Sequence, residues 1–142
     1  MATYILTWHP YAFRMEAGEY LEQVENVRAQ ADKRLGSWST GQRNSEIEIG
    51  DRVFLFRQKR ERGIVASGHC TSTIYQDTHW RDRRRSANYV HITWDFWKPL
   101  EDRLKIEVLE NKVPDFSWNH LQGSGIHLED SCAAKVEKLW TA

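Results

Sequence analysis

Apolar residues fall in short runs along this 142-residue chain, and most of these runs have the length of a β-strand. The first run, residues 3–8, predicts a strand that ends before His9-Pro10. Residues 52–56 predict a buried strand, and residues 64–75 predict a second one after a charged turn that ends in Gly63. Two strands around a short polar turn form a β-hairpin, which we expect at the centre of the fold.

A helix is predicted from residue 16 to residue 35, because its apolar residues recur three and four positions apart on one face. Glutamates crowd its start, and Gly36 follows as the predicted C-cap. We expect residues 36–41 to form a loop with Trp38 at its middle. A second helix is predicted from residue 128 to residue 140.

The second half of the chain predicts further strands. Residues 76–87 read as a long polar loop, and residues 89–94 alternate between apolar and polar positions as a strand with unequal faces does. Residues 104–109 predict a short edge strand, and residues 114–125 a loop. The whole order predicts a single α+β domain over residues 1–142, with a compact barrel-like sheet of about five or six strands and helices packed outside.

The charge is balanced overall but uneven along the chain. Lys and Arg number 20, as do Asp and Glu, yet residues 52–85 contain nine basic and three acidic side chains. Two basic runs, residues 57–62 and 81–85, predict an anion-binding face, although solvated loops have the same composition. We expect these side chains to contact a nucleic-acid backbone: Arg43, Arg57, Lys59, Arg60, Arg62, Trp80, Arg81, Arg83, Arg84 and Arg85.

The two cysteines, Cys70 and Cys132, are too few for a disulfide framework and lack metal-ligand spacing. The N-terminus does not read as a signal peptide, and no apolar run has transmembrane length. We therefore expect a reduced, cytoplasmic protein that has no membrane partner and requires no metal or cofactor.

Three of the seven tryptophans, Trp8, Trp38 and Trp118, lie at a predicted strand end or in predicted loops, beside small polar residues. Most tryptophans belong to a core, but a ring between glycines and hydroxyls can stay open to a flat ligand. Aromatic walls with hydroxyl and amide groups at the rim suit a nucleobase. Gln122 and Ser124 could read the edge of such a base.

Signals for catalysis are poor. The six histidines show neither zinc spacing nor a triad order. Glu110 and Lys112, with Asp102 upstream, imitate a nuclease motif only faintly, and such short patterns are common.

An ordered set of segments resembles a known family. The chain resembles the EVE domains of the PUA-like superfamily, above all those at the N-terminus of modification-dependent restriction endonucleases with a C-terminal HNH nuclease. The resemblance spans almost the whole chain and rests on residues 4–8, 36–41, 50–58, 62–68, 75–80, 116–125 and 138–140. Residues 37–39 are also similar to a loop of YTH domains that gives one wall of a methyl-base cage.

The resemblance implies a curved barrel sheet with a pocket for one modified base flipped out of double-stranded DNA. It implies Trp38 as a cage wall with Ser39 and Thr40 at the rim, and it implies Trp8 and residues 118–124 as further walls. The modified base would be 5-methylcytosine or 5-hydroxymethylcytosine, read for a restriction system. No HNH nuclease follows in this chain, so we expect recognition without cleavage.

Three alternatives stay open at this point. An RNA-binding PUA-like domain could use the same pocket for a modified or unpaired base. A small enzyme could hold a metal on Asp102 and Glu110, with Lys112 beside them. A protein-interaction module could use the basic loops to meet an acidic partner.

Overall fold

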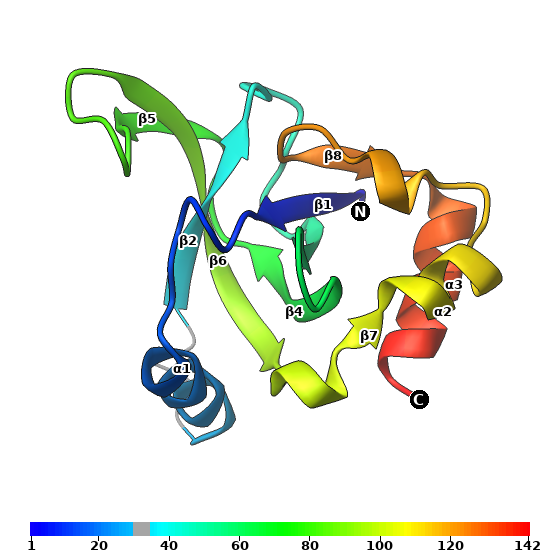
Figure 1. Cartoon of the computed structure of the whole chain (residues 1–142). Coiled ribbons are helices and arrows are strands. Elements are labelled where there is room, and N and C mark those ends of the chain that lie inside the picture. The colour runs from blue at the N-terminus through cyan, green and yellow to red at the C-terminus, as the bar shows by residue number, and fades with distance from the viewer. Residues whose placement is uncertain (30–34) are drawn as a thin grey trace.

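A computed structural model describes residues 1–29 and 35–142, and Figure 1 shows the arrangement of its elements. The strands are β1 (Thr3–Trp8), β2 (Leu35–Gly41), β3 (Arg52–Arg57), β4 (Gly63–Cys70), β5 (Tyr75–Thr78), β6 (Ser86–Trp97), β7 (Leu104–Lys105) and β8 (Ile126–Leu128). The α-helices of the described residues are α1 (Ala17–Ala29), α2 (Ile106–Lys112) and α3 (Asp130–Trp140). Two 3₁₀ turns, η2 (Leu100–Asp102) and η3 (Trp118–His120), lie between them.

All eight strands belong to one curled mixed sheet. Six of them follow the order β2-β6-β4-β3-β1-β8, while β5 pairs with β6 and β7 pairs with β4. Among the strand pairs of the described residues, only β1–β3 is parallel. The long strand β6 pairs in turn with β5, β2 and β4, so it carries the curl of the sheet. The predicted α+β fold with a curved sheet and flanking helices is confirmed.

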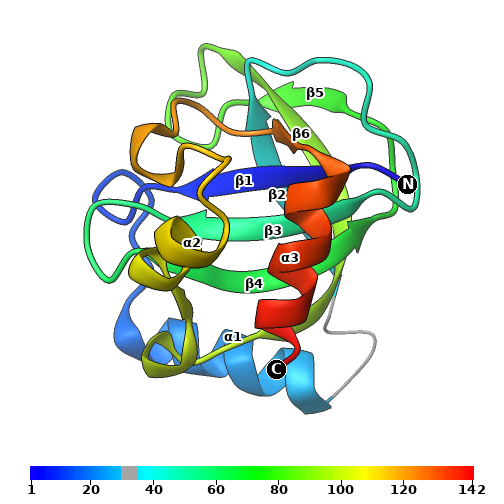
Figure 2. The same ribbon diagram turned by 90° about the vertical axis from the view of Figure 1, so that its right-hand side faces the viewer.

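Each face of the sheet has its own hydrophobic core. Along β1, Leu6 packs with α1 on one face and Ile5 packs with α2 and α3 on the other. The strand β3 is buried along its whole length because both of its faces are covered, which explains its unbroken apolar run. Figure 2 shows α2 and α3 in front of β1, β3 and β4, with α1 at the bottom of the molecule.

A buried arginine fixes α3 against the sheet. Arg52 of β3 donates from Nε to Glu137 of α3 at 2.6 Å and from Nη1 to Asp95 of β6 at 2.5 Å. The indole of Trp140 donates to the hydroxyl of Ser67 at 2.8 Å, and that hydroxyl donates to Asp95. Because Arg52 has two carboxylate partners, its burial is compensated.

The sequence prediction is confirmed for residues 3–8, the central hairpin and the alternating strand, but it is wrong at three other segments. Residues 35–41 form strand β2 and not a helix end and loop, and part of the predicted helix, residues 30–34, lies outside the described residues. Gly36 lies in β2 because its missing side chain leaves room for the Trp94 indole, which a Cβ atom would meet at 2.3 Å. Residues 75–78 form β5 within the predicted polar loop, and residues 106–112 form a helix where an edge strand was expected.

Candidate functional site

A cavity of about 360 Å³ opens at the seam between β1 and β2, which do not pair with each other. Its volume is in the range of small-ligand sites. Four segments line it, the end of β1, the loop after β1, the strand β2 and the turn before β8, together with two aromatic residues near the β5–β6 turn. The lining residues are Thr7, Trp8, His9, Phe13, Ser37, Trp38, Ser39, Gly41, Trp80, Tyr89, Gly123 and Ser124.

Side-chain hydrogen bonds hold the seam in place of a strand ladder. The hydroxyl of Ser124 donates to the backbone oxygen of Ser39 at 2.8 Å and accepts from the N–H of Thr7 at 3.0 Å. The indole N–H of Trp38 donates to the backbone oxygen of Thr7 at 3.0 Å. Gly123 and Gly125 on either side of Ser124 have positive φ angles of 79° and 73°, which glycine adopts without strain. The turn before β8 therefore fastens β1 to β2 beside the cavity.

Three aromatic rings form the open part of the wall. Phe13 contacts Trp38 and Trp80 edge-on, with centroid distances of 5.5 Å and 5.6 Å. Phe13 and Trp80 are 39% and 42% exposed, so both rings can contact a molecule that enters. Trp8 forms a deeper part of the wall. Its ring stacks on Tyr20 and lies beside the guanidinium of Arg57, and its indole N–H donates to the backbone oxygen of Phe13 at 2.7 Å.

The cavity carries no formal charge from its wall. None of its lining residues is Asp, Glu, Lys or Arg. Burial raises the pKa of Tyr89 above its ordinary value, which keeps the phenol neutral, and its hydroxyl donates to the backbone oxygen of Thr78 at 2.8 Å. A neutral aromatic lining suits an uncharged flat ring better than a phosphate group.

Several polar groups of the lining remain available to read the edge of such a ring. The Nδ1 atom of His9 accepts from the N–H groups of Tyr11 and Ala12, both at 3.2 Å, so in the neutral imidazole Nε2 carries the proton. The hydroxyl of Ser37 makes no hydrogen bond to any residue within 1–29 and 35–142. The indole N–H of Trp80 likewise has no partner within these residues, so two nitrogen donors and one hydroxyl are available for the edge of a base.

Several predicted pocket residues do come together here. Trp8, Trp38, Ser39 and Ser124 all line the cavity, although the hydroxyl of Ser124 is already used to hold the seam. Trp80, which was expected at the nucleic-acid backbone, lines the cavity too. The binding roles of these residues stay predictions.

The structure corrects three of the predicted pocket residues. Trp118 lies in the other core, where it stacks on Phe56 and donates to the backbone oxygen of Val113 at 3.0 Å, so it is not a cavity wall. Thr40 is fully buried and its hydroxyl donates to the backbone oxygen of Arg43. Gln122 is exposed but does not line the cavity.

The predicted backbone contacts divide into engaged and free cations. Arg57 is only 4% exposed, lies 4.8 Å from the Trp8 ring and pairs with Glu61 at 3.1 Å, so its surface role is wrong. Arg43 donates to the backbone oxygen of Gly125 at 2.5 Å, and Arg62 donates to Asn119 at 2.6 Å. The exposed cations are Lys59, Arg60, Arg81, Arg83, Arg84 and Arg85, of which Arg84 pairs with Asp82.

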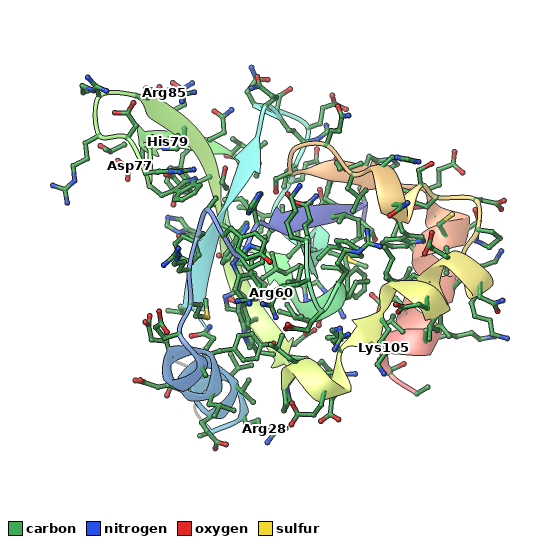
Figure 3. The ribbon with its side chains drawn as sticks, in the orientation of Figure 1. Arg28, Arg60, Asp77, His79, Arg85 and Lys105 are labelled. Atoms are coloured by element: carbon green, nitrogen blue, oxygen red, sulfur yellow. The ribbon has the colours of Figure 1, made fainter. Side chains whose placement is uncertain are left out.

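The exposed cations occupy two separate tips. Figure 3 shows Arg60 near the middle of the molecule at the β3–β4 turn, and Arg85 and His79 at the projecting end of the β5–β6 hairpin. Trp80 belongs to the second of these turns and also to the cavity wall. Trp80 therefore links the cavity wall to the basic β5–β6 turn.

Sequence reasoning missed His9, Phe13, Ser37 and Tyr89. His9 and Phe13 follow β1 in a loop whose path over the sheet no local pattern predicts. Tyr89 begins the alternating strand, and its alternation does not reveal that this residue lines the cavity.

Metal chemistry has no support in the described part of the chain. Across residues 1–29 and 35–142, no three His, Cys, Asp or Glu side chains gather into a possible metal site. Asp102 lies in η2 and Glu110 lies in α2. Nor does any helix among these residues have the length and apolar character needed to cross a bilayer.

Comparison with known proteins reveals the fold but no family. No protein-family model matches the chain, and no curated protein matches it significantly. Among solved structures, a protein from Pseudomonas syringae aligns with a TM-score of 0.67 and 14% identity over 98% of this chain and 99% of its own. Human THYN1, solved in complex with 5-methylcytosine-containing DNA, aligns at 0.62 and 12% identity over 100% and 99%. ASCH from Zymomonas mobilis aligns at 0.55 and 10% identity over 97% and 95%.

Proposed function

We propose that this protein binds double-stranded DNA that contains 5-methylcytosine or 5-hydroxymethylcytosine and receives the flipped base in the cavity between β1 and β2. The single observation that carries the proposal is an uncharged cavity walled by Phe13, Trp38 and Trp80 beside exposed basic turns. A neutral base fits the aromatic wall, while its phosphates fit the surrounding cations.

The proposal divides the binding energy between two kinds of contact. Flipping a base out of a duplex costs a few kcal/mol, and stacking in the cavity together with edge contacts must offset that cost. Exposed cations such as Arg85 would bind phosphates regardless of sequence, which supplies salt-dependent affinity. The modification would then decide which duplexes gain the cavity contacts.

The fold of human THYN1 supports the choice of ligand, because that protein has been solved in complex with 5-methylcytosine-containing DNA. The resemblance to EVE domains adds the biological setting. In that setting the chain is the non-catalytic recognition domain of a modification-dependent restriction system, with an HNH nuclease outside these 142 residues. The two free, buried cysteines fit a reduced cytoplasm.

A binding titration at fixed salt tests the proposal. Four duplexes of one sequence carry cytosine, 5-methylcytosine, 5-hydroxymethylcytosine or N6-methyladenine at one site. We expect one modified-cytosine duplex to bind at least tenfold more tightly than the unmodified one, a difference of about 1.4 kcal/mol. Equal affinity for all four duplexes would contradict recognition of a modified base. Tighter binding of a matched RNA with the same modification would favour the RNA-binding alternative.

A further inference from the structure

An exposed aromatic ring stands beside the cavity without lining it. Tyr11 lies between His9 and Phe13, which both line the cavity, yet 54% of its own surface is exposed to solvent. Its ring meets the His9 ring edge-on at a centroid distance of 5.8 Å. Tyr11 is therefore attached to the cavity wall but faces outward.

The turn that carries Tyr11 is held by its own hydrogen bonds. The N–H groups of Ala12 and Phe13 donate to the backbone oxygen of His9 at 3.0 Å and 2.9 Å. The imidazole of His9 caps the same turn by accepting from the N–H of Tyr11. A ring on such a fixed turn loses little conformational entropy when it binds a partner.

An unpaired cation lies over this ring. The Cζ atom of Arg60, from the β3–β4 turn, is 5.2 Å from the centroid of Tyr11. Arg60, labelled in Figure 3, is an exposed residue of the β3–β4 turn. It forms no ion pair with a carboxylate in the part of the chain that the structure describes. A guanidinium group binds phosphate oxygens through two parallel hydrogen bonds. An aromatic platform and a phosphate-binding group thus meet outside the neutral cavity.

We propose that Tyr11 and Arg60 form a second nucleotide subsite, where Tyr11 stacks on the base next to the flipped one and Arg60 binds the phosphate between the two. This inference rests on the proposed function. A base that leaves the duplex deprives its neighbour of a stacking partner, and an aromatic side chain can replace that contact. The cavity takes the neutral modified base, and the subsite takes the charged backbone and the next base.

Fluorescence of 2-aminopurine, which brightens when it loses stacking, tests the subsite with the full chain. Two duplexes carry 5-methylcytosine with 2-aminopurine as either its 5′ or its 3′ neighbour. In one of them we expect the complex of Tyr11→Ala to be brighter than that of the wild type, and Tyr11→Phe to match the wild type because stacking needs only the ring. Tyr11→Ala should also bind about tenfold more weakly, as expected for one lost base–aromatic stack.

The arginine is tested through the salt dependence of binding. Arg60→Gln should lower the slope of log K against log salt concentration by about one, the effect of one lost phosphate contact. Two matched controls are residues that do not line the cavity. Phe96→Ala removes an aromatic ring that is 48% exposed, and Lys135→Gln removes an exposed cation of α3; both should behave as wild type.

The outcomes separate the subsite from the function on which it rests. If the wild type prefers modified DNA but Tyr11→Ala leaves brightness and affinity unchanged at both neighbours, the subsite is wrong and the cavity proposal stands. If the wild type shows no preference for modified DNA, both fail. If Arg60→Gln binds DNA with the same salt slope as the wild type, Arg60 does not contact a phosphate. All variants must melt as wild type does, which the exposure of Tyr11 and Arg60 leads us to expect.

Discussion

Replacement of Trp38 by alanine removes the wall residue on which the cavity depends most. Its ring contacts Phe13 at 5.5 Å, and its N–H donates to the backbone oxygen of Thr7 across the seam. Loss of one base–aromatic stack costs about 1–3 kcal/mol, so we expect Trp38→Ala to bind 5-methylcytosine DNA about 5- to 150-fold more weakly. Binding to unmodified DNA, which uses the exposed cations, should change little.

The same substitution also affects the fold, and a second variant separates the two effects. Trp38→Ala loses the hydrogen bond to Thr7, worth about 1 kcal/mol of the free energy of unfolding. Trp38→Phe loses that bond but keeps an aromatic ring, so it should be less stable yet retain most of its preference for modified DNA. The assays are fluorescence anisotropy with labelled duplexes at fixed salt and urea unfolding of each variant.

One result would refute the assignment of Trp38. If Trp38→Ala is folded and binds the modified duplex with the affinity and preference of the wild type, the ring is only a structural link between β1 and β2. Trp80→Ala, which alters the exposed side of the same cavity, should then be the more damaging change.

Three further predictions concern the basic tip, the buried ion pair and the buried thiol. Arg85→Gln should lower the salt slope of DNA binding by about one while leaving the preference for modified DNA intact; an unchanged slope would exclude a phosphate contact. Glu137→Ala removes one of the two carboxylate partners of Arg52 and should reduce the free energy of unfolding by about 1–2 kcal/mol in urea titrations. Burial raises the pKa of the Cys70 thiol from 9.0 to about 12, so the stability this neutral thiol contributes is complete below pH 9 and is lost as the pH rises to about 12. At pH 10 the wild type should have lost about 1 kcal/mol relative to Cys70→Val, and parallel pH profiles of the two proteins would contradict this.

The pattern of apolar and polar residues predicted the strands in which a whole face is buried. The strand at residues 3–8 and the first hairpin strand at residues 52–57 occur where expected, whereas the second hairpin strand ends at Cys70 and not at the predicted Tyr75. The alternation at residues 89–94 correctly placed Val90 on the buried side. In each case the pattern reflects burial of a whole strand face.

Local patterns gave wrong predictions for residues whose environment depends on contacts with distant segments of the chain. Gly36 reads as a helix cap, but it pairs with Ile92 of β6 in a strand, and the indole of Trp94 occupies the space that a side chain at this position would need. Trp118 has small polar neighbours in sequence, yet Phe56 stacks on it from β3 and buries it. Arg57 belongs to a basic run, but the ring of Trp8 and the carboxylate of Glu61 hold it inside.

The candidate site was therefore predicted in part. Trp38 and Trp8 were identified because their ring size and position near loops made them unusual. Phe13 and His9 were missed because their role depends on how the loop after β1 folds over the seam. The residue types were enough to predict an aromatic site with polar groups at its rim. The structure was needed to show which residues line the cavity.

The seven tryptophans allow a direct test of base entry. Each indole N–H gives its own signal in a nitrogen–proton correlation spectrum, and the rings divide between the cavity and the cores. During titration with a 5-methylcytosine duplex, we predict changes at Trp38 and Trp80, while Trp118 and Trp140 in the other core stay unchanged. The unmodified duplex should leave the Trp38 signal where it was. Identical spectra with both duplexes, or no change at Trp38 with the modified one, would contradict a base-binding cavity at this seam.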